Sequence, residues 1–342
     1  MTGFAPPLPP TPGPSTGNVH SVAQRQVRML RTAMGPAIAA ALEDPDVVEV
    51  LLNPDGVLWV DTLSTGRRDT GLTLSREDGD RIIRLVAAHV RVEVNRETPI
   101  VSAELPETGE RFEGLIPPVV PAPTFAIRKR ASLVYTLDRY VADRILSPQQ
   151  AAFLAQAVRD RLNIVIAGGT STGKTTLANA LLDEVARTGD RVLILEDTRE
   201  LQCLAPDQVA LRTKPGVASM SELVRSTLRL RPDRIVVGEV RGSEALDLLK
   251  AWCTGHPGGI ATVHAGSAAG ALHRLEQLIQ EVVVTVPRPL IAEAVDVVAF
   301  IAGRGINRRV REIARVDGLG PDGGYRLELL PSTEMPLNGD LS

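Results

Sequence analysis

The sequence has 342 residues, enough for about two domains, and 44% of them are hydrophobic and 23% charged. Lys and Arg number 38 and Asp and Glu number 41, so the net charge of −3 gives no overall basic footprint for nucleic acid or an anionic membrane. The two cysteines are too few for a disulfide framework or a cysteine-based zinc site. No apolar window suits a membrane-spanning helix and no secretory signal is visible, so we expect a cytoplasmic protein.

The first 130 residues predict a tail followed by a small domain. Residues 1–18 are crowded with proline, glycine and serine, which cannot bury surface in a helix or sheet, so we expect a disordered tail. Residues 19–130 predict an α+β domain. Its expected elements are a helix with apolar residues at 27, 30, 34, 38 and 42, a hairpin over 47–61, a helix that begins near Ser75, and short strands that end near 125–128.

The rest of the chain predicts a larger α/β domain. Residues 131–150 are expected to be a linker, at whose end Ser147 and Pro148 suit the start of a helix. Over 151–330, short apolar runs alternate with helical patterns, which indicates a mainly parallel sheet with helices on both faces. Strands are expected at 163–167, 192–195, 209–211, 235–237, 260–263, 295–301, 310–316 and 325–330, with helices at 175–186, 221–230, 244–252 and 268–280, and 331–342 is expected to be a tail.

A glycine-rich turn between an expected strand and helix carries the clearest chemical signal. Residues 168–175 match the phosphate-loop (P-loop) pattern G-x-x-x-x-G-K-[ST]. Glycines let the backbone N–H groups converge on phosphate oxygens, the lysine supplies a point charge, and the last hydroxyl can ligate Mg²⁺. The expected nucleotide-binding residues are Gly168, Gly169, Thr170, Ser171, Thr172, Gly173, Lys174, Thr175 and Thr176.

Three polar residues follow the ends of later strands. Glu196 comes after one apolar run and Glu239 after another, and carboxyl ends of parallel strands face the ligand crevice in an open α/β sheet. His264 follows a third run, and we expect it either to sense the γ-phosphate or to contact a neighbouring subunit. Hydrolysis needs a group that orients water, and these residues could supply it.

These motifs, in this order, resemble those of the secretion, or traffic, ATPases, the RecA-like motors of type IV secretion, conjugation, type II secretion and type IV pili. The family's Asp box is similar to residues 196–200, its atypical Walker B to 231–239 and its His box to 255–265. The resemblance covers about 20–320. Segments 51–56 and 111–130 resemble the TrbB-like conjugal transfer ATPases, and the absence of a four-cysteine module also favours this branch.

The resemblance implies a homohexamer with a RecA-like ATPase core, in which ATP and Mg²⁺ bind between the two domains of each subunit. By this analogy Glu239 and Glu196 polarise the attacking water, Lys174 holds phosphate, and His264 senses the nucleotide. Thr175 would ligate Mg²⁺, with Glu239 reaching the ion through water. Arg128 matches an arginine through which the N-terminal domain reaches ATP, and Arg111 and Arg130 are further candidates. The implied partners are secretion or conjugation subunits at the cytoplasmic face of the inner membrane.

Other functions stay open from the residues alone. A RecA-like nucleic-acid motor would need a basic, aromatic-bearing channel, and only 3% of residues are aromatic, which argues against strong direct nucleic-acid binding. The one candidate segment for it contains Arg304, Arg308, Arg309 and Arg311. An ATPase of type IV pili or type II secretion, a nucleotide-gated scaffold and a small-molecule kinase are the remaining alternatives.

Overall fold

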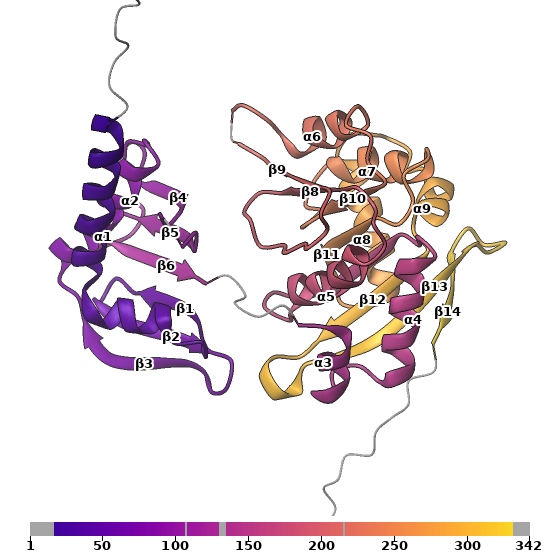
Figure 1. Cartoon of the computed structure of the whole chain (residues 1–342), viewed down its shortest axis with the longest axis horizontal. Helices are drawn as coiled ribbons and strands as arrows, with labels where there is room; N and C mark the ends of the chain where they lie inside the picture. The colour runs from indigo at the N-terminus through magenta and orange to yellow at the C-terminus, as the bar shows by residue number, and fades with distance from the viewer. Residues whose placement is uncertain (1–16, 107, 130–134, 215, 331–342) are drawn as a thin grey trace, which may run out of the picture. The chain divides into compact units, whose positions relative to one another are not determined.

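The computed structural model describes residues 17–106, 108–129, 135–214 and 216–330 (Figure 1). The chain divides into two compact units, Met1–Arg130 and Ala131–Ser342. The tail expected over 1–18 lies outside the described residues up to residue 16, and the tail expected over 331–342 lies outside them entirely. Residues 17 and 18 already belong to the first helix.

The first unit is an antiparallel sheet with two helices on one face. Its six strands lie in the order β3-β2-β1-β6-β5-β4. Leu30 and Ile38 of the first helix and Ile83 of the second pack with alternate strand residues such as Phe112 and Ile127 to form the core. The elements are α1 (Gly17–Glu43), β1 (Val47–Leu52), β2 (Val57–Thr62), β3 (Gly66–Thr73), α2 (Arg76–His89), β4 (Ile100–Glu104), β5 (Arg111–Leu115) and β6 (Thr124–Arg128).

The second unit has an eight-stranded sheet in the order β14-β13-β12-β7-β11-β10-β8-β9. The strands from β12 to β9 are parallel, and β13 and β14 add to them as antiparallel strands. The elements are α3 (Leu137–Ala142), α4 (Pro148–Arg159), β7 (Ile164–Gly168), α5 (Lys174–Ala186), β8 (Val192–Glu196), β9 (Gln208–Arg212), α6 (Met220–Thr227), β10 (Arg234–Val237), α7 (Glu244–Cys253), β11 (Ile260–His264), α8 (Ala268–Gln280), α9 (Arg288–Ala294), β12 (Val297–Ala302), η1 (Gly305–Asn307), β13 (Arg309–Leu319) and β14 (Tyr325–Leu329).

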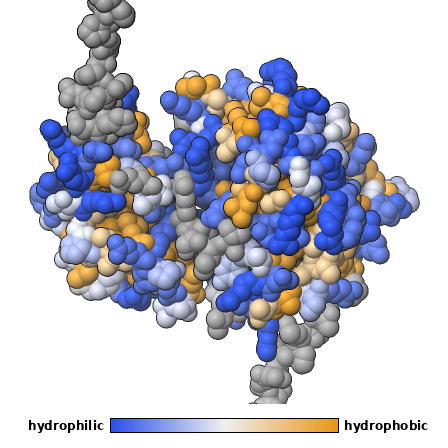
Figure 2. Space-filling view, in the orientation of Figure 1, coloured by the Kyte–Doolittle hydropathy of each residue, from blue (hydrophilic) through white to orange (hydrophobic). Residues whose placement is uncertain are grey.

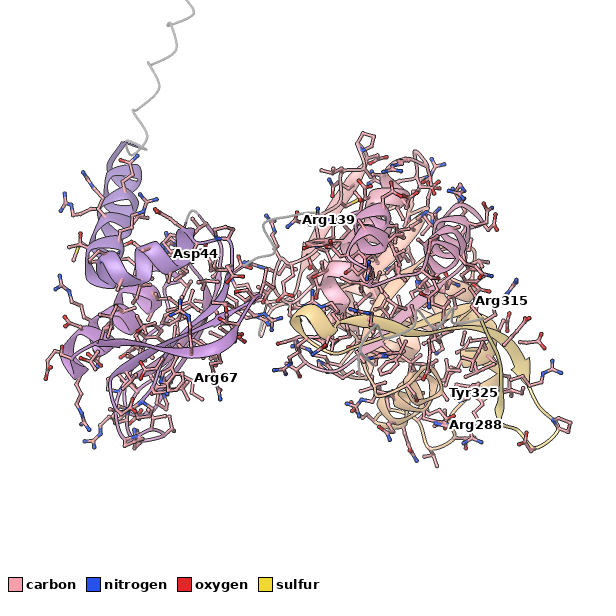
Figure 3. All side chains as sticks on the ribbon, turned by 90° about the horizontal axis from the view of Figure 1, so that it is seen from below. Asp44, Arg67, Arg139, Arg288, Arg315 and Tyr325 are labelled. Atoms are coloured by element: carbon pink, nitrogen blue, oxygen red, sulfur yellow. The ribbon has the colours of Figure 1, made fainter. Side chains whose placement is uncertain are left out.

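Two apolar layers cover the two faces of this sheet. Alternate strand residues explain the division, since Ile164 and Ile166 of β7 join α3, α4 and α5, whereas Val165 and Ala167 join α6 to α9. A parallel sheet covered by helices on both faces confirms the predicted α/β core. Where β14 extends the sheet, Tyr325 lies near Arg288 of α9 in Figure 3, and Arg288 pairs with Glu276 of α8 at 3.0 Å.

The structure differs from one expectation about the path of the chain and adds one helix. The segment expected to be a linker over 131–150 contains α3, and its Leu137 and Tyr140 are buried in the core of the second unit. Residues 131–134 lie outside the described part of the chain. Helix α9 is a further element that was not predicted from the sequence, and its Pro289 lies in the first turn, where a proline loses no hydrogen bond.

No helix among the described residues is long and apolar enough to span a membrane. On the face seen in Figure 2, hydrophilic and hydrophobic side chains are interspersed.

Candidate active site

The P-loop connects the end of β7 to the start of α5. Gly168 must be a glycine, because an added Cβ would lie 2.6 Å from both the Ile301 carbonyl oxygen and Thr172 Oγ1. Gly173 has a φ of +97°, a backbone conformation that residues other than glycine rarely adopt. Lys174 is buried, and its Nζ donates to the Gly169 carbonyl at 3.0 Å. The loop is therefore held in a tight turn at a helix N-terminus, where N–H groups are placed to bind an anion.

The Asp box, residues 196–200, is attached to this helix. Glu196 ends β8 and is 5% exposed, and its Oε1 accepts the N–H groups of Glu200 at 2.9 Å and Leu201 at 2.7 Å. Thr175 Oγ1 donates to Glu200 Oε2 at 3.4 Å. The buried Asn179, one turn further along α5, donates to the Glu200 carbonyl and accepts the N–H of Gln202. These contacts place the Asp box beside the P-loop.

Glu239 follows β10, and its two carboxylate oxygens have different neighbours. Oε2 accepts from Arg241 Nε at 2.8 Å. Oε1 is buried and lies 2.7 Å from His264 Nε2, an ion-pair distance, but it has no hydrogen bond of good geometry among the described residues. Arg241 Nη1 also lies 3.6 Å from Asp197 Oδ2, so this arginine connects Glu239 to the Asp box. Oε1 therefore remains available to accept a hydrogen bond.

His264 ends β11, and its Nε2 lies 3.4 Å from Lys174 Nζ as well as beside Glu239. Burial, reinforced by the charge of Lys174, lowers the pKa of His264 below its usual value, and Glu239 only partly opposes this effect. The imidazole is therefore neutral at pH 7. The structure thus gathers Lys174, Glu239 and His264 at the carboxyl ends of neighbouring parallel strands.

Arg128 lies in the first unit, on β6. Its Nε lies 4.0 Å from Glu49 Oε1 of β1, and in the strand register it is directly opposite Arg111 of β5. Like charges directly opposite each other on a sheet repel, and Glu49 partly offsets the charge of Arg128. Arg130 lies outside the described residues.

Two side chains beside the P-loop, Asn179 and Arg304, were not predicted from the sequence to belong to the nucleotide site. Asn179 is four residues after Thr175, a helical spacing that places both on one face and could have indicated it. Arg304, which belonged to the candidate nucleic-acid segment, donates from Nη2 to the Thr170 carbonyl at 3.1 Å. Nothing in the local sequence indicates this contact, because it depends on β12 lying beside β7.

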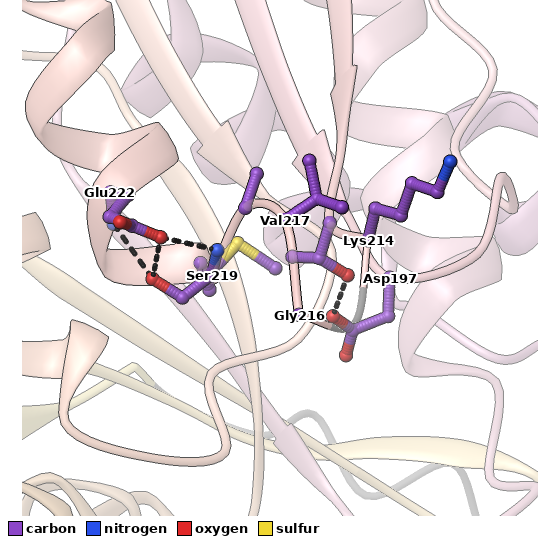
Figure 4. Close-up of a pocket in the computed structure, with 9 residues that line it drawn as sticks. Asp197, Lys214, Gly216, Val217, Ser219 and Glu222 are labelled. Atoms are coloured by element: carbon purple, nitrogen blue, oxygen red, sulfur yellow. Dashed lines mark hydrogen bonds between the residues drawn. The ribbon is translucent and has the colours of Figure 1, made fainter.

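A hollow of about 410 Å³ lies beside Asp197 of the Asp box (Figure 4). Asp197 lines it together with the segment that follows β9, and Asp197 Oδ1 accepts from Thr213 Oγ1 at 2.7 Å. Lys214 and Val217 line it as well, whereas the P-loop residues do not. The hollow is therefore distinct from the cluster around Lys174.

Comparisons with known proteins agree with this geometry. Residues 73–308 match the family model described as "Type II/IV secretion system protein". The chain is 48% identical to a probable conjugal transfer protein TrbB of Sinorhizobium fredii over 91% of this chain and 95% of the relative. It is 47% identical to the conjugal transfer protein TrbB of Rhizobium radiobacter, over 86% of this chain and 91% of that protein.

Among solved structures, the pilus retraction motor PilT with bound ADP is similar in fold. The TM-score is 0.58 at 19% identity, with 89% of this chain and 84% of the PilT chain covered. The family match and the relatives confirm the resemblance inferred from the motifs. The chain belongs to the type II/IV secretion system protein family and, within it, to the TrbB-like secretion ATPases.

Proposed function

We propose that this chain is a homohexameric motor that hydrolyses ATP to energise conjugal DNA transfer or a type IV secretion channel or pilus. The observation that carries the proposal is the convergence of three side chains at one point. His264 Nε2 lies 2.7 Å from Glu239 Oε1 and 3.4 Å from Lys174 Nζ. The TrbB relatives are named as conjugal transfer proteins, which supports the choice of process.

In this proposal the P-loop binds the phosphates of ATP. Residues 168–176 supply backbone N–H groups, and Lys174 exchanges its contact with the Gly169 carbonyl for phosphate oxygens. This exchange neutralises the charge that develops on the transferred phosphoryl group.

Magnesium fits the residues present. Thr175 supplies a hydroxyl oxygen, Glu239 Oε1 is a buried oxygen without a hydrogen-bond partner among the described residues, and hard cations prefer such ligands. The described residues contain no group of three or more His, Cys, Asp or Glu placed to ligate a metal. Magnesium bound with nucleotides commonly uses only one or two protein ligands, so Thr175 and Glu239, the latter through water, suffice. The ion would polarise the phosphate oxygens.

The two glutamates take different roles in this proposal. Oε1 of Glu196 accepts hydrogen bonds from two backbone N–H groups at the end of the Asp box, so Glu196 mainly orders that loop beside the phosphates. Glu239 has Oε1 available to orient the attacking water and to accept its proton, while Arg241 fixes the other oxygen. His264, neutral and in contact with both Glu239 and Lys174, reports whether the γ-phosphate is present.

The remaining roles concern the N-terminal domain and the ring. Arg128 and Arg111, which lie opposite each other on β6 and β5, bind phosphate oxygens. Binding and release of ATP then move the N-terminal domain, and unequal occupancy around the ring transmits the motion. The motor works at the cytoplasmic face of the inner membrane through other subunits of the machinery, and direct nucleic-acid binding is weak or absent.

The test combines hydrolysis assays, ADP binding and light-scattering mass. We expect a hexamer whose turnover falls about 100-fold or more in Glu239→Gln with ADP binding retained, and less in Glu196→Gln. Lys174→Ala should lose nucleotide binding. The exposed Glu328→Gln serves as the control of equal charge change. Turnover in Glu239→Gln close to that of the unmodified protein would overturn the assignment of Glu239, and a monomer under all conditions would overturn the ring.

A further inference from the structure

The loop between β12 and β13 approaches the P-loop from the side opposite to the glutamates. In the sheet, β11, β10 and β8 lie on one side of β7 and carry His264, Glu239 and Glu196, whereas β12 lies on the other side. Ile301 of β12 is paired with Gly168 of β7. Residues 303–308, here called the β12–β13 loop, therefore leave the sheet next to the P-loop.

This loop is folded tightly enough to return over the P-loop. Gly303 has a φ of +82°, and an added Cβ would lie 2.2 Å from the Asn307 carbonyl oxygen, so only glycine permits the closed turn. The turn contains η1 and ends at Arg308, directly before β13.

Two arginines of the loop contact the P-loop backbone. Arg304 Nη2 donates to the Thr170 carbonyl at 3.1 Å. The guanidinium of Arg308 lies against Gly173, where an added Cβ would be 3.1 Å from Nε and 3.2 Å from Cζ. The two contacts lie at Thr170, the second variable position of the P-loop pattern, and at Gly173, its second fixed glycine.

The side chain of Arg308 is packed inside the protein as well as against Gly173. Its Nε is buried and has no hydrogen-bond partner among the described residues. Tyr140 of α3, which is 1% exposed, lies close enough for the charge of Arg308 to act on its hydroxyl. Burial raises the pKa of Tyr140 well above its ordinary value, and the charge of Arg308 acts in the opposite direction. A guanidinium is planar and remains charged, so it can pack against a glycine backbone and also add positive potential at an anion site.

We propose that Arg308, assisted by Arg304, is a positioning residue of the nucleotide site, which holds the P-loop in its phosphate-binding form through Thr170 and Gly173. The inference rests on the proposed binding of ATP at this loop. It differs from the roles of Glu239 and His264, because Arg308 acts on the loop backbone and leaves the attack on the γ-phosphate unchanged. It also assigns Arg304 and Arg308 to the nucleotide rather than to a nucleic acid.

The test compares Arg308→Gln and Arg304→Gln with Arg311→Gln, whose side chain is exposed on β13 and provides the same change of charge. Three quantities are measured: the KM and kcat for ATP, the Kd of a fluorescent ADP, and the displacement of that ADP by inorganic tripolyphosphate. Removal of one positive charge close to an anion site is expected to weaken affinity about tenfold. We expect KM, the Kd of ADP and the tripolyphosphate constant to rise together by about this factor in Arg308→Gln, with kcat within about twofold.

A smaller change in the same direction is expected for Arg304→Gln, since its side chain is exposed, and none for Arg311→Gln. The melting temperature of each variant without nucleotide shows whether it is folded. If Arg308→Gln is unfolded, Arg304→Gln still tests the inference. Unchanged ADP and tripolyphosphate binding in both variants would overturn the inference. Weaker ATP and ADP binding with unchanged tripolyphosphate binding would overturn it as well, because Arg308 would then contact the nucleoside. A failure of the proposed function looks different: the unmodified protein would show no binding that depends on Lys174.

Discussion

Nε2 of His264 lies 2.7 Å from Oε1 of Glu239, although His264 ends β11 and Glu239 follows β10. The same nitrogen is 3.4 Å from Lys174 Nζ. A neutral imidazole nitrogen either donates or accepts, so it can serve the carboxylate or the ammonium but not both at once. This contact links the group proposed to activate water to the group proposed to hold phosphate.

The pH dependence of hydrolysis should reveal the protonation of His264. Its pKa lies below the ordinary value of 6.5, because burial and the Lys174 charge disfavour the imidazolium. We expect kcat to be constant from pH 8 to about 6.5 and to fall only below that, when a second cation appears beside Lys174 and engages Glu239. The acidic fall should disappear in His264→Gln and persist in His256→Gln, whose ring contacts the Pro232 carbonyl. A fall that begins above pH 6.5 would contradict this prediction.

Removal of Arg241 should separate catalysis from binding. Its Nε holds Glu239 Oε2 at 2.8 Å, and its Nη1 lies 3.6 Å from Asp197. We expect Arg241→Gln to lower kcat roughly tenfold to a hundredfold, because Glu239 is no longer held in place, while the Kd of ADP stays nearly unchanged. Arg225→Gln removes an exposed pair with Asp247 and should have no effect on kcat. Equal losses in the two variants would contradict the role of Arg241.

A buried ion pair at the amino ends of β8 and β10 should contribute strongly to the free energy of unfolding. Arg234 is 1% exposed, donates to Asp190 Oδ2 at 2.6 Å, and also donates to the carbonyls of Gly258 and Val158. We expect Asp190→Asn to lower the free energy of unfolding by about 3 kcal/mol at pH 7, because the guanidinium is left buried without its partner. Asp183→Asn removes a surface partner of Arg187 and should cost about 0.5 kcal/mol or less.

The cost of Asp190→Asn should depend on pH. Burial alone would raise the pKa of Asp190, but hydrogen bonds from Arg234 and Thr188 outweigh it, so the pKa lies below its ordinary value of 3.8. A depressed folded-state pKa gives stability that is present above the ordinary value and lost as the pH falls through the folded value. The difference between Asp190→Asn and the unmodified protein should therefore be constant above about pH 5 and shrink below 3.8. Urea unfolding over this range would show a constant difference if the pair were unimportant.

The glycine before β11 should tolerate no side chain. A Cβ at Gly259 would lie 2.0 Å from Nε1 of Trp252 and 2.7 Å from the Ile235 carbonyl oxygen, and Trp252 is 2% exposed. We expect Gly259→Ala to destabilise the second unit by about 3 kcal/mol or more, since neither the indole nor the strand can move freely. Gly266→Ala has nothing within 4 Å of its added Cβ and should change the melting temperature little. Similar melting temperatures for the two variants would contradict the packing argument.

Local sequence patterns predicted those parts of the fold that depend on neighbouring residues. Ser147 caps α4 in a reciprocal capping box with Gln150, as the Ser-Pro start indicated, and α8 spans the expected residues. The P-loop was predicted from its glycine-rich pattern, and Glu196, Glu239 and His264 because each follows or ends an apolar run. The structure places Lys174, Glu239 and His264 close together, and their roles stay predictions. Helix α3 was missed because a short helix with two buried residues has too few repeats to show a period.

Contacts between distant strands could not be predicted in the same way. Arg304 and Arg308 reach the P-loop only because β12 pairs with β7, and strand order is not encoded in any local period. Arg241 lies two residues after the Walker B segment, but its contact with the Asp box depends on how β10 and β8 lie in the sheet. Which oxygen of Glu239 is occupied likewise depends on geometry that only the folded chain supplies.

The position of β7 between β11 and β12 determines when this strand can pair during synthesis of the chain. Its two neighbours are β11 (Ile260–His264) and β12 (Val297–Ala302), both of which are made long after the P-loop itself. A ribosome-bound chain that ends between β8 and β11 therefore presents both edges of a fully apolar strand unpaired. Nascent chains of this protein should depend on chaperones during that interval, and nucleotide could begin to stabilise them only after the last flanking strand has emerged.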